Sequence, residues 1–333
     1  MTKNKMGGNL VAHSKITRRS LLGSGAAIGL LGACSDLPSD LTRQDRSPIE
    51  GGIGGTGIVG LVTDFGSLIV NGLKVETNGR TRYSDANGRM SGSAVGLADS
   101  LTIEATTRQG RLLAKRVHVT HPLIGRIQAV AGFGAALLVN GVVVQVEPQA
   151  RGRAAPGDRV RISGLWRGNT VVASQVIRTT AETDVIAGEV SAASGTISIG
   201  GTQIFTGGFG SGVDDGQFAT ITGKFSGSIL NASRITPNRF IGAAGELKRL
   251  SIEGYLDPAN TAPGFKVSGL GHSFAENLEL SPFQSTRTLF DGPYTGKFEA
   301  TRGLILPNSY QSRRSFLQTR LDGDDLENWT PTT

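Results

Sequence analysis

Short runs of alternating apolar and polar residues recur along most of the chain. Val160 and Ile162 lie two positions apart in one such run, and Ala219 and Ile221 do so in another. Period two is typical of strands with one buried face, because successive side chains point to opposite sides of a sheet. No stretch after the first 34 residues keeps an apolar period of 3.6 over more than about ten residues. The pattern therefore predicts an all-β protein with little helix.

The strand pattern returns in successive copies along the chain. A glycine within an apolar strand opens the copies at Gly60, Gly125 and Gly188, and a weaker copy opens around Gly254. The interval is roughly 65 residues, which is too long for one turn of a solenoid and is typical of small domains in tandem. We therefore expect three similar domains and a fourth, degenerate one.

Each copy contains a tight turn between two apolar runs. Asn71-Gly72 and Asn140-Gly141 are the strongest short-range signal for a hairpin, because both residues of such a pair tolerate positive φ. Gly200 and Gly201 stand at the same place in the third copy. A second stretch of each copy, such as 156–164, predicts another strand, and a closing strand follows it.

Five short strands in about 60 residues, the first bent at a glycine, predict a small five-stranded barrel of the OB type. Small β-sandwiches are the alternative architecture. The expected organisation, in which a signal helix precedes the β-domains, is a signal peptide at 1–33, a flexible tether at 34–55, barrel repeats at 56–120, 121–182 and 183–240, a degenerate β repeat at 249–310, and a polar tail at 311–333.

The order of these motifs resembles a family of bacterial envelope domains, the domain of unknown function numbered 5666. Its members share a G-x-[VI] start, a V-N-G hairpin and a G-D-x-V-x-[IV]-x-G strand, often in tandem behind a lipoprotein signal. The resemblance covers roughly residues 56–236 well and 250–305 poorly, since the fourth copy lacks the Asn-Gly turn. It implies a module of the cell envelope and brings no catalytic residues.

The N-terminal segment has the features of an export signal. Arg18 and Arg19 precede a hydrophobic pair, which resembles a twin-arginine motif, and a mildly apolar run follows at 21–32. Such a run rises about 18 Å as a helix, well short of the roughly 30 Å hydrocarbon core of a bilayer. It is therefore expected to be a removable segment rather than a membrane span.

The run ends at Leu31-Gly32-Ala33-Cys34, which resembles a lipobox. This resemblance implies cleavage before Cys34 and acylation of its sulfur, with fatty acids such as palmitate anchoring the protein to a membrane on the periplasmic side. Ser35 favours the outer membrane over the inner one. Because Cys34 is the single cysteine of the chain, intrachain disulfides are excluded.

The distribution of charge argues against a nucleic-acid partner. The formal net charge is +7, but the export segment carries Lys3, Lys5, Lys15, Arg18 and Arg19 and no acid. The remainder is close to neutral, so it has no electrostatic footprint for nucleic acid.

Few residues suggest chemistry. His118 and His121 are weak candidates for metal ligands, but a site needs a third ligand, and we interpret the pair as part of a solvated linker between domains. No Gly-x-Ser-x-Gly elbow is present. Trp166 is interpreted as a plug at a barrel end rather than a stacking platform. The sequence Ser312–Leu317 repeats the twin-arginine pattern, which we interpret as coincidence. We therefore expect no enzyme, no metal and no cofactor.

The sequence as a whole predicts an exported, lipid-anchored protein with a non-catalytic binding or structural role in the envelope, whose partner is an envelope protein or a glycan. A lipoprotein that binds glycan or another small solute is the alternative. An enzyme assembled between barrels is a third hypothesis, which a close cluster of His118 or His121 with acids would favour.

Overall fold

The computed structural model describes residues 55–193, 195–208, 212–237, 239–240, 246–259, 264–267 and 278–322. They belong to one compact unit, Pro48–Thr333. The expected signal peptide with Arg18 and Arg19 and the expected acylation site Cys34 lie outside the described residues, as does nearly all of the expected tether. The described fold therefore comprises the repeats and the segment that follows them.

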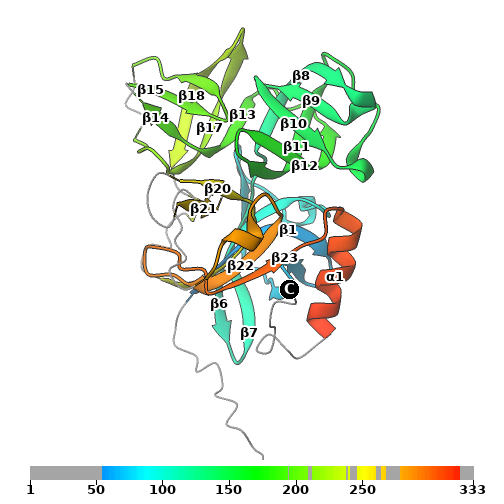
Figure 1. Cartoon of the computed structure of the whole chain (residues 1–333), viewed down its shortest axis with the longest axis vertical. Coiled ribbons are helices and arrows are strands. Elements are labelled where there is room, and N and C mark those ends of the chain that lie inside the picture. Colours follow the sequence, from blue (N-terminus) through cyan, green and yellow to red (C-terminus); the bar gives the residue numbers. More distant parts are fainter. Residues whose placement is uncertain are drawn as a thin grey trace, which may run out of the picture. The chain divides into compact units, whose positions relative to one another are not determined.

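The first repeat forms a closed barrel, called barrel 1 (Figure 1). Its elements are β1 (Gly55–Asp64), β2 (Leu68–Val70), β3 (Leu73–Glu76), β4 (Arg82–Asp85), β5 (Gly88–Arg89), the 3-10 turn η1 (Gly92–Ala94), β6 (Ser100–Arg108) and β7 (Arg111–Val119). The ring runs β1-β2-β3-β7-β6 and back to β1, with a parallel pairing between β3 and β7. The small β4–β5 hairpin pairs with β7 outside this ring.

The second repeat forms barrel 2 with the same ring. Its elements are β8 (Leu123–Ala131), η2 (Gly132–Gly134), β9 (Ala136–Val139), β10 (Val142–Val146), η3 (Pro148–Ala150), β11 (Arg159–Arg167) and β12 (Thr170–Arg178). The order β8-β9-β10-β12-β11 closes on β8, again with a parallel pairing between the third and fifth strands. The prediction of tandem five-stranded, OB-like barrels is confirmed, and the closed rings exclude two-sheet sandwiches for these repeats.

The third repeat keeps this order of pairings with a divided first strand. Its strands are β13 (Asp184–Glu189), β14 (Ser191–Ala193), β15 (Thr196–Ile199), β16 (Thr202–Phe205), β17 (Phe218–Ser226) and β18 (Ile229–Pro237). Val190 separates β13 from β14; β13 pairs with β17, and β14 pairs with β15. The two segments thus share the role that one bent strand has in each of the barrels.

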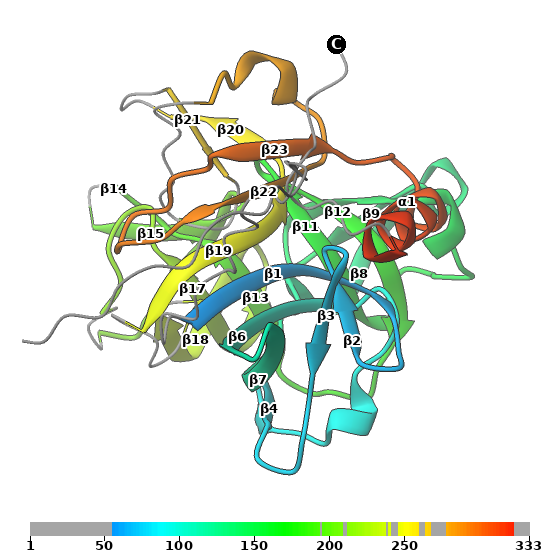
Figure 2. The same ribbon diagram turned by 90° about the horizontal axis from the view of Figure 1, so that it is seen from below.

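The fourth repeat departs from the barrel. Its elements are β19 (Leu247–Gly254), β20 (Leu256–Pro258), β21 (Phe265–Val267), η4 (Ser281–Phe283), β22 (Thr288–Pro293) and β23 (Arg302–Ile305). Within the parts of 247–305 that are described, β19, β22 and β23 form one antiparallel run and β20 and β21 a separate pair. The long strand β19 lies parallel to β1 of barrel 1 (Figure 2), so the fourth repeat extends the sheet of the first.

A helix, α1 (Tyr310–Asp322), follows the last strand, where the sequence suggested only a polar tail from residue 311. Within residues 310–319, whose burial is described, Tyr310, Arg313 and Leu317 are buried, at the helical spacing of three and four positions. One of the three is an arginine, so the buried face has no apolar period that hydropathy could detect.

The two residues at the G-D position of each repeat hold the bend of the first strand. The backbone N–H of Val62 donates to the carbonyl of Asp99 at 2.9 Å, and the N–H of Ala98 donates to the carbonyl of Val62 at 2.9 Å. The same two bonds join Ile127 to Asp158 and Gly157, and Val190 to Gln217 and Gly216. Ala98, Gly157 and Gly216 all have positive φ, which explains the preference for glycine before the acidic or amide residue.

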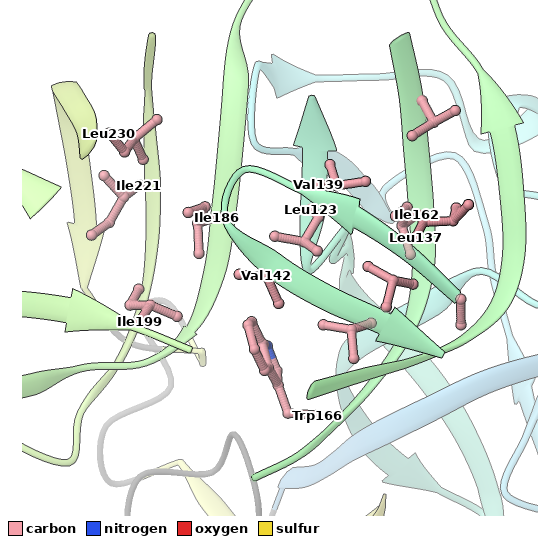
Figure 3. Packing of buried hydrophobic residues seen from close by; sticks show 14 of the residues in the cluster. Leu123, Leu137, Val139, Val142, Ile162, Trp166, Ile186, Ile199, Ile221 and Leu230 are labelled. Carbon is pink, nitrogen blue, oxygen red and sulfur yellow. The ribbon is translucent and has the colours of Figure 1, made fainter. Parts of the chain in front are cut away.

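The buried apolar cores do not correspond one to one with the repeats. Barrel 1 has a core of its own, built from residues such as Val62, Leu101 and Val117. Barrel 2 and the third repeat share one continuous core, in which Val142 and Trp166 of barrel 2 lie close to Ile199 of the third repeat (Figure 3). The antiparallel pairing of β8 with β13 carries this shared core across the junction.

Candidate functional site

The asparagine of the first Asn-Gly turn connects two repeats. Asn71 has a φ of 58° and Gly72 a φ of 71°, as expected for a tight hairpin. The Asn71 amide Nδ2 donates to the carbonyl of Val59 in its own first strand at 3.0 Å and to the carbonyl of Ser251 in β19 at 3.1 Å. The turn residue therefore fastens barrel 1 to the fourth repeat.

Asn140 makes the corresponding contacts in barrel 2. Its Nδ2 donates to the carbonyl of Ile124 at 2.9 Å and to that of Val185, in β13, at 3.2 Å. A Cβ placed on the opening glycine, Gly60 or Gly125, would lie less than 3.0 Å from the asparagine side chain. The opening glycine and the turn asparagine therefore act together. Because the glycine has no side chain, the asparagine amide can lie against the first strand.

Trp166 takes the place of the asparagine in the third repeat, whose turn is Gly200-Gly201. Its indole Nε1 donates to the carbonyl of Ala187 at 2.7 Å, the residue before the opening glycine Gly188. The ring lies against Gly188 and Gly200, where a Cβ would collide with it. Trp166 is 7% exposed. It therefore joins barrel 2 to the third repeat, which agrees with the interpretation of a plug.

A buried ionic network links barrel 1, barrel 2, the fourth repeat and α1. The Glu253 carboxylate accepts from the backbone N–H of Leu61 at 3.0 Å and from Arg287 Nε at 2.7 Å. Glu147 accepts from Arg287 at 2.9 Å and from Arg313 at 2.7 Å. Both guanidinium groups are at most 1% exposed. Alternating charges of this kind compensate one another where water cannot, although Arg287 Nη2 has no hydrogen-bond partner among the described residues.

The network favours the ionised form of Glu253 and holds the start of α1. Burial alone would raise the pKa of Glu253, but the charges of Arg287 and Arg313 together with the hydrogen bonds hold it below its usual range. The backbone N–H of Tyr310 donates to Glu147 at 3.0 Å, and the Tyr310 hydroxyl donates to the carbonyl of Val62 at 2.7 Å. The helix is therefore attached to both barrels. No feature of the sequence analysis pointed to these residues.

His121 is buried, so the interpretation of a solvated linker is wrong for this residue. It is 4% exposed at the junction of the two barrels, and burial with the charges of Arg161 and His118 lowers its pKa to about 3. The cause is the pairing of β11 with the start of β8, which follows directly after the linker and draws it against barrel 2.

Ser163 lies between His121 and Asp99, an arrangement reminiscent of a catalytic triad in a different order. Its hydroxyl donates to Asp99 Oδ1 at 2.9 Å and lies 3.5 Å from His121 Nδ1. In a triad the imidazole stands between the hydroxyl and the acid. Here the hydroxyl proton is directed to the carboxylate, and the neutral imidazole is too weakly basic to remove it. These contacts hold the two barrels together.

His118 lies in β7 and is half-buried. Its Nδ1 is 3.0 Å from the hydroxyl of Ser84, and burial lowers its pKa. It faces a cavity of about 210 Å³ that is also lined by Asp85 and Thr120 of barrel 1 and by Phe218 and Arg239. In the described part of the chain no cluster of three histidine, cysteine or acidic residues has the geometry for a metal ion. The structure thus gives neither histidine a set of metal ligands.

A larger cavity, about 580 Å³, lies at the junction of barrel 2 and the third repeat. Its walls carry both signs of charge: Arg159 pairs with Asp184 at 2.9 Å, and the Lys224 ammonium donates to the carbonyl of Glu182 at 2.6 Å. Phe225 supplies an aromatic ring. Such a lining suits a polar solute that offers both donors and acceptors.

Within the described residues, no helix is both long and apolar enough to span a bilayer. The family model described as "Domain of unknown function (DUF5666)" matches residues 56–118 and 124–177, which are the two closed barrels. The repeat structure inferred from the motifs is thereby supported for these segments. No curated protein and no solved structure matches the chain.

Proposed function

We propose that the protein is an exported lipoprotein, anchored to a membrane on the periplasmic side through acylated Cys34, whose repeats form a non-catalytic binding or structural module of the cell envelope. The outer membrane is the favoured location. The observation that carries the binding or structural role is the buried network around Glu253 and Arg287, which joins barrel 1, barrel 2 and the fourth repeat. Such a joined set of repeats suits a platform that presents fixed surfaces.

The anchor is supported by the sequence. Cys34 is the single cysteine and stands directly after an apolar run that follows Arg18 and Arg19. The first strand begins at Gly55, which leaves a connecting segment between the acylated residue and barrel 1. This segment is the proposed tether between the anchor and barrel 1.

Labelling with radioactive palmitate in the native host tests the anchor. The wild-type chain is expected to take up label and to remain with membranes, and Cys34→Ser to do neither, because only a thiol accepts the diacylglyceryl group. Ser35→Cys is the control: it leaves Leu31–Cys34 unchanged and is expected to take up label as the wild type does. Equal labelling of Cys34→Ser and wild type would contradict the anchor.

The export route has its own test. Replacement of both Arg18 and Arg19 by lysine keeps the charge of the segment but removes the guanidinium pair, and it is expected to retain the precursor in the cytoplasm. Replacement of Lys3 and Lys5 by arginine is the matched control and should leave export unchanged. Normal export of the double-lysine variant would exclude the twin-arginine route.

The junction cavity favours a second candidate function, the uptake of a glycan or another polar solute. Its mixed charges and Phe225 offer hydrogen bonds and an apolar face, which sugars use together. A thermal-shift series with envelope sugars and divalent ions tests this, with Phe225→Leu as a variant that keeps an apolar residue there. A stabilisation that Phe225→Leu abolishes supports it, and no response counts against it.

A further inference from the structure

The end of barrel 2 contains an apolar cavity of about 250 Å³. Its floor and walls are the side chains of Leu137, Val146, Val160, Val176, Ala150 and Ala154. The mouths of β-barrels are common places for small ligands, and an apolar cavity binds the apolar part of a ligand. The cavity is separate from the junction with the third repeat.

Barrel 1 is filled at the matching position. Val95 and Ala154 occupy equivalent places before Asp99 and Asp158, whose carboxylates accept the N–H groups of Gly96 and Ala155. The Val95 side chain is 6% exposed and belongs to the core of barrel 1. Tyr83 and Met90 also pack against that core. Ala154 of barrel 2 therefore leaves open space that the larger Val95 side chain occupies in barrel 1.

The rim of the cavity carries positive charge. Arg153 and Arg178 line it, and Arg178 is engaged, with its guanidinium 2.8 Å from Asp158 and donating to the carbonyl of Arg153 at 2.9 Å. The Arg153 side chain is exposed and forms no ion pair with any described residue. An anion above the apolar floor would therefore meet an available guanidinium.

An exposed aromatic residue, Phe133, directly precedes Gly134, which lines the cavity. Phe133 is fully exposed and has a φ of 53°, a conformation that a bulky residue rarely adopts. Its neighbours Gly132 and Gly134 also have positive φ, and Gly134 lines the cavity. An apolar ring held in water in an unfavourable backbone conformation gains contacts when a ligand enters next to it.

We propose that the mouth of barrel 2 binds a medium-chain amphiphilic carboxylate. The aliphatic chain occupies the space between Leu137 and Val176, the carboxylate pairs with Arg153, and Phe133 covers the part of the chain that leaves the cavity. The proposal extends the small-solute candidate and depends on neither the Cys34 anchor nor the junction cavity. Failure of palmitate labelling would therefore contradict only the anchor, and failure of carboxylate binding would contradict only the ligand site.

The test uses the full chain with Cys34→Ser, prepared without detergent, and sodium octanoate as the probe. Methyl-labelled leucine and valine report the location by NMR. Octanoate is expected to shift the methyl signals of Leu137, Val146, Val160 and Val176, with a Kd on the order of 0.1–1 mM for a ligand of this size. Octan-1-ol is expected to bind about tenfold more weakly, because it lacks the charge. Absence of these shifts, or equal binding of the alcohol, would overturn the proposal.

Two variants test separately how the aliphatic chain and the carboxylate of octanoate contribute to binding. Ala154→Leu fills the cavity and is expected to weaken octanoate binding at least tenfold. Arg153→Gln leaves the cavity intact and should weaken octanoate, but not octan-1-ol, by about tenfold. Arg108→Gln, an exposed arginine of barrel 1, is the matched control and should bind as the parent does. Unchanged octanoate binding by Arg153→Gln would refute the role of the guanidinium, even where Ala154→Leu fails to fold.

Discussion

Barrel 1 and barrel 2 have the same ring of strands, the same asparagine turn and the same opening glycine, yet they meet their neighbours by different means. Barrel 1 places β1 parallel to β19, and buried charges from Glu253 and Arg287 lie at this joint. Barrel 2 places β8 antiparallel to β13 and shares an apolar core with the third repeat. The shared motif therefore specifies the barrel and its first strand, whereas residues outside the motif determine which strand pairs with the remaining edge of that first strand.

The two joints differ in what they tolerate. A buried ion pair stabilises little relative to well-packed apolar residues, but loss of one partner leaves an uncompensated charge in the interior. Truncation of a side chain in an apolar joint costs the transfer free energy of the removed atoms and a cavity term, but it leaves no uncompensated charge. Loss of one side chain at the joint of barrel 1 is therefore expected to lower the free energy of unfolding more than loss of one side chain at the joint of barrel 2.

The largest effect is expected at the polar joint. Arg287→Met leaves Glu147 and Glu253 with one cationic partner, Arg313, and should lower the free energy of unfolding by about 3–5 kcal/mol. Urea denaturation followed by circular dichroism measures it. Arg111→Met, which breaks the exposed pair with Glu76, is the control and should cost less than about 1 kcal/mol. Similar losses in the two variants would contradict the high sensitivity expected of the buried polar joint.

The contact between the opening glycine and the turn asparagine can be tested by a double-mutant cycle within each barrel. Gly60→Ala forces a methyl group against Asn71 and should cost about 1–3 kcal/mol. Asn71→Gly keeps the positive φ but loses the amide bonds, with a cost of about 1–3 kcal/mol. Because the double variant has no clash, its cost should fall short of the sum of the two single costs.

Gly125→Ala and Asn140→Gly give the same cycle for barrel 2, measured by the same urea transitions. Non-additivity of similar size in the two barrels is expected, because the two asparagines hold the same contacts. Strictly additive costs in either barrel would show that its glycine and asparagine act independently.

The sequence was sufficient for the parts of the fold that local chemistry determines. The hairpins at Asn71 and Asn140 follow from their tolerance of positive φ, and the barrel follows from five alternating segments per copy. The ionic network could not be foreseen in this way. Glu147 and Arg313 are 166 positions apart, and Glu147 and Arg287 are 140 positions apart. Their charges come together only after barrel 2, the fourth repeat and α1 have folded against one another.

Position in the sequence was also misleading for His121. It follows strand β7 and precedes a proline, a place typical of an exposed linker. Its burial depends on how closely barrel 1 packs on barrel 2, which no local pattern specifies. Trp166 shows the opposite case: its identity suggested a plug, but the missing asparagine of the third repeat gave no indication that a neighbouring barrel supplies the replacement donor.

The burial of His121 predicts a pH dependence located at the junction of the barrels. Its pKa is about 3 in the folded protein and about 6.5 in the unfolded chain. Above pH 6.5 neither state binds the proton. Below it the unfolded chain does so first, so stability falls with decreasing pH by up to about 1.4 kcal/mol per unit.

Unfolding free energies of wild type and His121→Asn between pH 7.5 and 5 test this, and the variant should lose part of the slope. His118→Asn is the comparison variant, because burial lowers the pKa of His118 as well and it contributes in the same direction. An unchanged slope in His121→Asn would contradict the burial of a neutral imidazole.

The smallest effect concerns the two barrel mouths. Ala154→Val gives barrel 2 the residue that barrel 1 has at Val95, and the added methyl groups enter an apolar cavity without displacing polar groups. Burial of this surface should raise the free energy of unfolding by about 0.5–1 kcal/mol. Ala192→Val, at an exposed position of β14, is the control and should remain within about 0.5 kcal/mol of wild type. A loss of stability in Ala154→Val would mean that the mouth of barrel 2 has no room for a side chain that the mouth of barrel 1 accommodates, and the contrast between a filled barrel and an open one would fail.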